Sequence, residues 1–360
     1  MHLPSHQLDL TTSAASAVLA AAALAASAFP GWKRVLGTGD SPTRQNLAAG
    51  EGLVPPTPGL LAGGAGLVFA LQMLNFPIST GASGHILGGL ALAIAFGPRS
   101  AMWLMAAIIT VQALLFGDGG LTTLGANILN MAIVGVWVGW GALRLSNAVL
   151  GNDSAQGKPE PLGHIARLAQ LAGVAFAGWV SVMAAALSCA VQLAVANQVN
   201  WWLVATTLLP VHAWIGLGDA LAAGMIYYAV AFSRGRGTKR VGVLPGANFT
   251  AAIYTAGLAL VAVVLAPWAS SLPDGLEWSL TKLNMEAIAE NAGSLAARLE
   301  NTLSPWQLAD YELPFWPGMG WSSMLAGWLG LAMVSGVVWM GVIAQAAMSK
   351  ARLAKLSPRR

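Results

Sequence analysis

The chain is 360 residues long, and 56% of its residues are hydrophobic while only 9% are charged. Soluble globular domains carry roughly 25% charged residues, so this composition excludes a soluble domain and indicates a protein embedded in a lipid bilayer. The net charge of +4 comes from basic residues in short loops beside predicted helix ends, where membrane orientation explains them better than nucleic-acid binding. The single cysteine, Cys189, excludes an intrachain disulfide and a thiolate metal cluster within one chain.

Hydrophobic segments of about 20 residues, long enough to span a bilayer, recur along the sequence. The segment 78–98 is the weakest, because its continuous apolar part after His85 is short and rich in glycine. A half-buried or re-entrant helix is the alternative to a full crossing there. We predict an all-α, polytopic transmembrane helix bundle with nine spans, over residues 13–32, 57–76, 78–98, 100–117, 121–143, 168–197, 201–232, 248–270 and 321–345.

The distribution of basic residues predicts the orientation of these spans. With the N-terminus outside and nine crossings, every lysine and arginine except Lys282 and Arg298 falls on the inner side. Basic residues prefer cytoplasmic loops, so we expect the C-terminus in the cytoplasm. The first span resembles a signal peptide in length, but the preceding MHLPSHQLDLTT lacks the lysine or arginine of a secretory n-region. This favours a retained helix.

A basic loop over residues 233–248 divides the chain, with seven predicted spans before it and two after it. We therefore predict a seven-helix domain over residues 1–235 and a two-helix domain over residues 236–360. The second domain carries an outside loop over residues 271–320, in which leucine and isoleucine recur at helical intervals. This pattern predicts a surface amphipathic helix that either rests on the membrane or covers the mouth of the first domain.

The Met1-His2 start offers a metal ion three nitrogens: the Met1 amine, the His2 amide and the His2 imidazole. With the amide deprotonated they close two fused chelate rings, and a fourth nitrogen completes the square-planar or tetragonal set of nickel(II) or copper(II). His85, in an SGH turn expected on the same side of the membrane, is the candidate for that nitrogen. The alternative is that His2 is an exposed terminal residue. His6 is either an accessory ligand or polar surface.

Other polar residues interrupt segments otherwise suited to lipid, where such groups are expensive and often mark a substrate path. Asp118 lies in a GDGG turn, where it either lines the path or bonds its own backbone. Asn127 and Asn130 share a helix face, where they hold the inserted N-terminus, orient a histidine, or only join helices. His212 and Asp219 also share a helix face, where they either support the structure around the site or form a proton relay.

Several of these segments together resemble the CbiM/NikM family, the substrate-capture membrane components of energy-coupling-factor cobalt and nickel transporters. The resemblance covers residues 1–232, through the MH start, NFPISTGASGHILGG, QALLFGDGGLTTLGANILNM and VHAWIGLGDA. The tail, through PDGLEWSL and ADYELP, resembles the family's small partner subunit (CbiN/NikN, or PDGLE domain) in fused form. The chain departs from the usual MHIPDG start, and has Asp219 where the family usually has glutamate.

The resemblance implies a nickel or cobalt ion, as transported substrate, held by the Met1 amine, the His2 amide and imidazole, and His85. It implies no bound organic cofactor. Its implied partners are membrane lipid, a separate transmembrane coupling protein and cytoplasmic ATPase subunits. Its implied location is a bacterial cell (inner) membrane, where the chain crosses several times.

We expect a transporter subunit and not an enzyme. The chain lacks the G-x-x-x-x-G-K-[ST] loop of an ATPase, and it also lacks HExxH and GxSxG. The leading hypothesis is therefore ATP-driven import of nickel or cobalt. The alternatives are a proton-coupled secondary transporter that uses His212 and Asp219, and a membrane scaffold whose polar residues only join helices.

Overall fold

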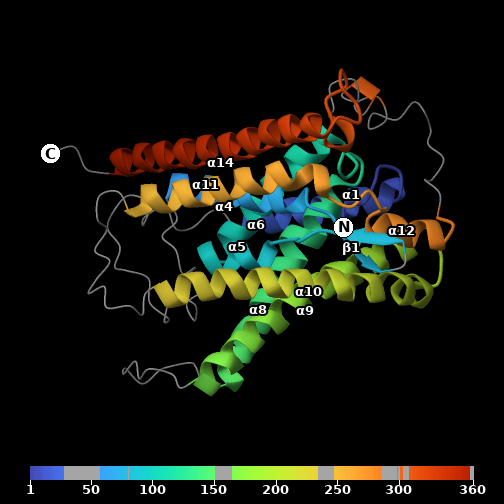
Figure 1. Ribbon diagram of the computed structural model, residues 1–360, viewed down its shortest axis with the longest axis horizontal. Coiled ribbons are helices and arrows are strands. Elements are labelled where there is room, and N and C mark those ends of the chain that lie inside the picture. Colours follow the sequence, from blue (N-terminus) through green and yellow to red (C-terminus); the bar gives the residue numbers. More distant parts are fainter. Residues whose placement is uncertain are drawn as a thin grey trace.

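The computed structural model describes residues 1–27, 57–79, 81–150, 164–233, 247–285 and 308–356, with residues 298, 301 and 302. These residues form a bundle of helices, which confirms the predicted helical class (Figure 1). The N-terminus lies beside a small β-hairpin and helix α12, and the C-terminus projects from the opposite end of the bundle (Figure 1).

Two π-helical stretches occur among the described residues, one at the C-terminal end of the helix Pro98–Val111 and one between Leu124–Asn127 and Val136–Val149. In chain order the elements are α1 (Leu10–Ala26), α4 (Pro58–Gln72), β1 (Phe76–Ser79), β2 (Ala82–Gly84), α5 (Gly89–Phe96), α6 (Pro98–Val111), η1 (Gln112–Phe116), α7 (Leu124–Asn127), η2 (Ile128–Gly135), α8 (Val136–Val149), α9 (His164–Ala196), α10 (Trp201–Ser233), α11 (Ala247–Leu265), η3 (Ala266–Trp268), α12 (Gly275–Lys282), η5 (Ala309–Tyr311) and α14 (Gly320–Leu356).

Several helices have the length and composition of membrane spans. Within the described ranges, shorter apolar helices cover Leu10–Ala26, Pro58–Gln72 and Thr255–Trp268. Five helical stretches are long and apolar enough to cross a membrane: Pro98–Phe116, Leu124–Val149, His164–Ala196, Trp201–Ala229 and Gly320–Gln345. The chain is thus a multi-pass membrane protein, and the count of nine crossings with the N-terminus outside remains a prediction.

Residues 78–98 do not form one continuous helix. β1 and β2 pair as an antiparallel hairpin, with Phe76 opposite Gly84. A loop follows, and then the eight-residue helix α5, every residue of which is buried. The structure thus has the covered, short helix that was the alternative to a full crossing at this position, because irregular backbone at membrane depth must be enclosed by protein.

Glycines set the bounds of this short helix. Gly88, with φ of 77°, precedes α5, and Gly97, with φ of 84°, ends it. Residues with a Cβ rarely adopt such positive φ angles. Pro98 then begins α6 at the first helical position, where its missing N–H leaves no hydrogen bond unmade.

One face of α10 carries a stripe of large side chains that are mostly exposed. Trp214, Leu217, Leu221, Met225 and Tyr228 follow one another at intervals of three or four residues, and each is more than half exposed. Such spacing places them on a single face of the helix. An apolar stripe of this size suits contact with lipid chains.

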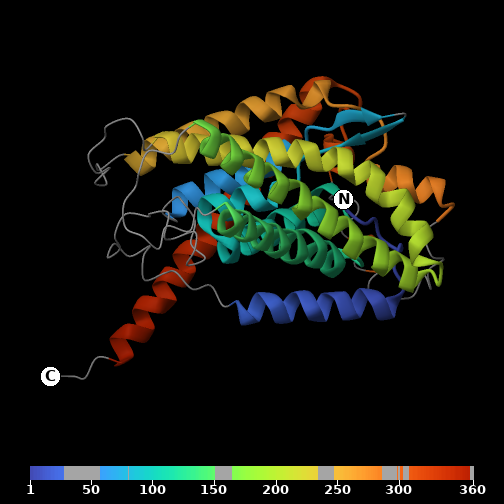
Figure 2. The same ribbon diagram turned by 90° about the horizontal axis from the view of Figure 1, so that it is seen from below.

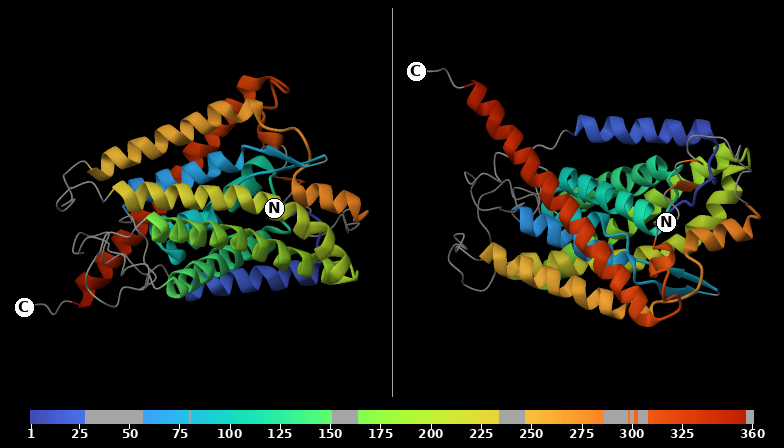
Figure 3. Two further views of the ribbon diagram at one scale, coloured as in Figure 1. Left: turned by 60° about the horizontal axis from the view of Figure 1, so that its bottom comes forward. Right: turned by 90° about the horizontal axis from the view of Figure 1, so that it is seen from above.

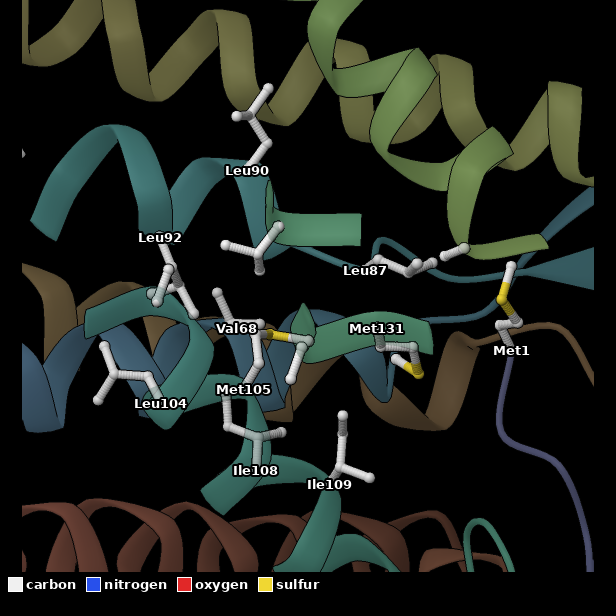
Figure 4. Packing of buried hydrophobic residues seen from close by; sticks show 14 of the residues in the cluster. Met1, Val68, Leu87, Leu90, Leu92, Leu104, Met105, Ile108, Ile109 and Met131 are labelled. Carbon is white, nitrogen blue, oxygen red and sulfur yellow. The ribbon is translucent and has the colours of Figure 1, made fainter. Parts of the chain in front are cut away.

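Small residues bring α9 and α10 close together, as is usual between membrane helices. A Cβ on Gly178 would lie 2.9 Å from the Cα of Ala220 on the facing helix. Large apolar side chains fill the centre of the bundle, where α4, α5 and α6 meet, and Leu90, Met105 and Ile108 are fully buried (Figure 4). This packing fixes the frame on which the N-terminal segment rests.

The helices that follow residue 246 cover one side of this frame. α11 and α14 both pack against α4, and α14 runs obliquely along the bundle before it projects past it (Figures 2 and 3). In the predicted loop 271–320, α12 packs on α10 with Leu276 and Leu280 buried, so this part of the expected amphipathic helix covers the first domain. The other apolar positions expected there (Ile288, Leu295 and Leu299) and the predicted boundary between residues 235 and 236 lie outside the described residues.

Candidate metal centre

The segment that precedes α1 runs into the bundle, and the side chains of Met1, His2 and Leu3 are buried. Its backbone is hydrogen-bonded to helix α7 and to the residue that precedes α7. Asn127 accepts from the Leu3 N–H at 2.8 Å through Oδ1 and donates to the Leu3 carbonyl at 3.1 Å through Nδ2. The Thr123 hydroxyl donates to the same carbonyl at 2.7 Å, so the buried backbone groups of Leu3 are satisfied.

The GDGG turn lets this segment approach closely. Gly120 donates its N–H to the Leu3 carbonyl at 2.8 Å, and a Cβ on Gly120 would lie 2.1 Å from the Ser5 nitrogen. Gly119 has φ of 85° and would hold a Cβ 3.3 Å from that of His2. Only residues without a side chain fit here, so the glycines determine the path of the N-terminal segment.

The Met1 amine points at His85. The two nitrogens, the amine and Nε2 of His85, are 3.2 Å apart, and the amine also donates to Asp274 Oδ2 at 3.0 Å. Nδ1 of His85 lies 3.2 Å from the Ile86 carbonyl. A hydrogen bond from Nδ1 to that carbonyl leaves the lone pair of Nε2 directed at the amine.

The electrostatics of this pair suit a metal ligand. Burial, and then the charge of the nearby N-terminal amine, lower the pKa of His85 to about 3, so its ring is neutral at physiological pH. Burial alone would raise the pKa of Asp274, but the charge of the N-terminal amine and its hydrogen bond to the carboxylate oppose this, and the pKa lies below its usual range. A neutral imidazole and an ionised carboxylate therefore face the amine.

His2 lies on the other side of His85. The two imidazole rings stack with centroids 5.3 Å apart and planes inclined by 15°. Nδ1 of His2 lies 3.0 Å from Asp118 Oδ1, while its Nε2 is buried and has no hydrogen-bond partner among the described residues. The chelate expected from the sequence uses Nδ1, so it requires the His2 ring to turn about Cβ–Cγ, away from Asp118.

Side chains alone do not make a metal site here. Among the described residues, no group of three histidine, cysteine, aspartate or glutamate side chains is close enough to hold an ion. Any site at this position needs the main-chain nitrogens of Met1 and His2 beside His85. Nitrogen donors of this kind suit nickel(II), copper(II) and cobalt(II).

The remaining sequence candidates fall into two groups. Asn127 and Asp118 touch the N-terminal segment, as described above. His6, with φ of 67°, donates its N–H to Thr122 Oγ1 at 3.1 Å, which holds the same segment on the turn. Asp219 accepts from the Gly88 N–H at 2.7 Å, and so holds the loop that carries His85.

Two candidates form their hydrogen bonds with helices and not with the N-terminal segment. Asn130 bonds Gln192 and Ser188 of α9, at 3.0 Å and 2.7 Å. His212 bonds the Leu208 carbonyl of its own helix through Nδ1 at 2.8 Å, and its Nε2 is buried with no partner in the described part of the chain. Asn130 therefore joins helices, whereas His212 lies near enough to the Met1 amine and Asp274 to interact electrostatically with both.

Two residues from the C-terminal part of the chain reach the centre, and neither was singled out as a site residue from the sequence. Asp274 pairs with the Met1 amine at 3.0 Å, and the Tyr311 hydroxyl donates to Asp118 Oδ2 at 2.5 Å. Both lie in the strings PDGLEWSL and ADYELP that carry the resemblance of the tail. The acidic and phenolic side chains in those strings were the sequence signal that could have identified these two residues.

Comparison with known proteins gives a consistent picture. Residues 2–236 match the model of the CbiM family, described as the cobalt uptake substrate-specific transmembrane region, and residues 248–346 match the PDGLE domain. A protein of Archaeoglobus fulgidus named as a fused nickel transport protein, NikMN, is 30% identical over 319 residues, which cover 87% of this chain and 89% of that protein. The cobalt transport protein CbiM of Propionibacterium freudenreichii is 43% identical over 98 residues, or 27% of this chain and 41% of that one. A solved chain described as a transition metal transporter is 26% identical, with a TM-score of 0.48, over 66% of this chain and 95% of that chain.

Proposed function

The chain belongs to the CbiM family of cobalt and nickel transport components, and from this premise we propose that it captures the ion for an ATP-driven, energy-coupling-factor importer. One observation carries the proposal. The Met1 amine, His2 and His85 lie together in a buried position, with a neutral imidazole aimed at the amine across 3.2 Å.

In the loaded state the Met1 amine, the His2 amide and imidazole, and His85 hold a nickel or cobalt ion as substrate. Asn127 and Asp219 keep these groups in place through the hydrogen bonds described above, and Asp118 holds the His2 ring until Nδ1 turns to the ion. Second-shell contacts of this type fix the orientation of the ligands and support their affinity. His6 fixes the path of the N-terminal loop through its backbone.

Energy for transport comes from other subunits in this proposal. A separate transmembrane coupling protein and cytoplasmic ATPase subunits bind the inner side of the bundle, in the bacterial cell membrane, with the N-terminus outside and the C-terminus in the cytoplasm. The capture domain covers residues 1–235 and the PDGLE-containing domain residues 236–360. The absence of a phosphate-binding ATPase loop in the sequence supports this division of labour.

Ion uptake into cells tests this function. Cells that lack their own nickel and cobalt importers would produce the chain with the coupling protein and ATPases of its own genome, and cellular ⁶³Ni and ⁵⁷Co would be counted. We expect uptake that is lost when the ATPase is inactivated by a substitution in its phosphate-binding loop. Uptake that survives this substitution but stops when the proton gradient is collapsed would instead support the secondary transporter with His212 and Asp219. A chain that supports no uptake under either condition would overturn both.

A further inference from the structure

Asp274 occupies the position before α12 from which an aspartate usually caps a helix. In that role the side chain accepts a hydrogen bond from a backbone N–H of the first helical turn. The Asp274 side chain makes no such bond. Its Oδ2 instead accepts from the Met1 amine at 3.0 Å, where the N-terminus lies beside α12 and the hairpin (Figure 1). The carboxylate therefore holds the N-terminus and not its own helix.

The position of this carboxylate is fixed relative to His85. Ser83 lies two residues before His85, and its N–H donates to the Pro273 carbonyl at 2.9 Å. Ser83 and Asp274 thereby pair as a short parallel bridge. On the other side, a Cβ on Gly275 would lie 2.7 Å from a side-chain carbon of α10, so α12 begins in direct contact with that helix. Contacts on two sides thus place Asp274 beside the amine.

The Met1 amine needs a counter-charge at this position. Met1 is 1% exposed, and a buried ammonium group without a partner is strongly destabilising. The other carboxylate of the centre, Asp118, bonds the His2 ring. The negative charge in contact with the amine is therefore that of Asp274. Without this charge, the N-terminal segment would be more stable in water, and its nitrogens would no longer lie beside His85.

The contact with Asp274 is compatible with a bound ion. Coordination removes one proton from the amine and uses its lone pair, but two N–H groups remain, and one of them can still donate to Oδ2. Neighbouring nitrogens at the corners of a square, each about 2.0–2.1 Å from the ion, lie about 2.9 Å apart. The amine and Nε2 of His85 are already 3.2 Å apart, so the amine needs to move little.

The net charge around the amine also stays the same when the ion binds. Apart from the pair of His2 and Asp118, the empty centre carries the single positive charge of the amine beside a neutral His85. The loaded centre carries a divalent cation and one negative amide nitrogen, because the amine and the His2 amide each give one proton to the solvent. The sum is again one positive charge, so one carboxylate balances the centre in both states.

We propose that Asp274 is a positioning residue that holds the Met1 amine inside the bundle as its counter-ion, both before the ion arrives and after it is bound. The role in the empty chain does not depend on metal binding, whereas the role in the loaded chain rests on the proposed function. The inference gives the region that matches the PDGLE domain a direct part in assembling the N-terminal nitrogens beside His85.

Protection of the Met1 amine in the metal-free chain is the first test. The full chain in detergent would be treated at one pH with an amine-acetylating reagent, and mass spectrometry would follow acetylation of Met1. Asp274→Asn keeps the shape of the side chain but removes its charge, and we expect acetylation at least about tenfold faster than in the parent. Glu277→Gln is the matched control, because it removes the same charge from an exposed position on the first turn of α12. It should leave the rate unchanged.

Two further comparisons separate the charge from packing. Asp274→Glu keeps the carboxylate on a longer side chain, and it should protect the amine better than Asp274→Asn does. Glycine and serine added before Met1 move the amine away, so in that background Asp274→Asn should lower the thermal midpoint of the metal-free chain less than in the parent. Equal acetylation rates of Asp274→Asn and the parent, or an equal lowering of the midpoint in both backgrounds, would overturn the inference.

Thermal unfolding with saturating nickel(II) tests the loaded state. Because the contact remains when the ion is bound, Asp274→Asn should lower the midpoint at least as much with nickel as without it. A lowering seen only without nickel would overturn the role in the loaded chain and leave the proposed function intact. A parent chain that binds neither nickel nor cobalt, but whose Met1 amine is protected by Asp274, would overturn the proposed function and support the role in the empty chain.

Discussion

The polar groups around Met1 and those around Asn130 are both buried in an apolar bundle, but their hydrogen bonds are arranged differently. Asn130 and Gln192 bond one another in both directions, at 3.0 and 2.8 Å, and Ser188 completes the group. Around Met1, in contrast, His85 Nε2 faces an amine, and His2 Nε2 has no partner among the described residues. Closed networks of the first kind join helices, whereas nitrogens with available lone pairs suit an ion.

The backbone around the two regions differs as well. The turn that receives the N-terminal segment lies between two π-helical stretches, η1 and η2. π-helical turns leave backbone groups displaced from regular helical bonding, and they are common at functional sites. The Asn130 group lies within η2 and ties it to α9. We infer that this bonded group supports the irregular helix on which the candidate site rests.

The largest effect is expected from loss of an imidazole in the N-terminal region. His85→Ala removes a nitrogen that faces the Met1 amine, and we expect nickel affinity to fall by more than about 100-fold, beyond the loss typical of a supporting residue. His164→Ala, at an exposed position at the start of α9, is the control. Isothermal titration with both variants checks this, and equal affinities for the two would contradict the assignment of His85.

A side chain added to the GDGG turn should have the next largest effect on metal affinity. Gly120→Ala places a Cβ 2.1 Å from the Ser5 nitrogen, so the N-terminal segment must move away from the turn. We expect metal affinity to fall by roughly 10- to 100-fold, in the range found when supporting structure is lost. Gly141→Ala, whose Cβ would meet no atom within 4 Å, is the matched control. Binding of Gly120→Ala as tight as that of Gly141→Ala would show that the segment need not lie in the turn.

Asn127→Ala tests whether the polar groups around Met1 support metal binding. It deletes two hydrogen bonds to Leu3, each worth about 1 kcal/mol, which together correspond to a loss of affinity of about 30-fold. The same titration measures it. If the thermal midpoint fell strongly while affinity stayed constant, Asn127 would belong with the groups that only join helices.

Asn130→Ala should lower the stability of the fold and cause the smallest change in metal binding. It leaves the buried amide of Gln192 without its partner, so we expect the free energy of unfolding to fall by about 1–2 kcal/mol. Metal affinity should stay within about twofold. Unfolding in detergent, followed by circular dichroism beside the titration, separates the two quantities. A large loss of affinity without a loss of stability would place Asn130 in the metal site instead.

The sequence predicted the helical class well but not the irregular backbone. Long apolar runs such as His164–Ala196 have few possible structures in a membrane, so composition was sufficient there. Residues 78–98 have similar composition, but they form a hairpin and the short helix α5. The positive φ angles of Gly88 and Gly97 depend on tertiary contacts, which hydropathy does not report.

The candidate site was predictable in part. Met1, His2 and His85 were chosen because of their chemistry and the family resemblance, and the structure places them together; their role as ligands stays a prediction. Asp274 and Tyr311 were missed because their contacts join positions 273 and 193 residues apart in the chain. No local pattern reveals such a pairing, since only the docking of the second domain creates it.

The central claim is that the Met1 amine is a metal ligand, and blocking it is the most direct test. Nickel and cobalt binding would be measured for the chain with a free Met1 amine, verified by mass spectrometry, and for a version with glycine and serine added before Met1. The same two residues added after Arg360 provide the control. We predict tight binding by the free-amine and C-terminally extended chains, and loss of binding by the N-terminally extended one. Equal binding by all three would contradict the account and remove the N-terminal nitrogens from the site.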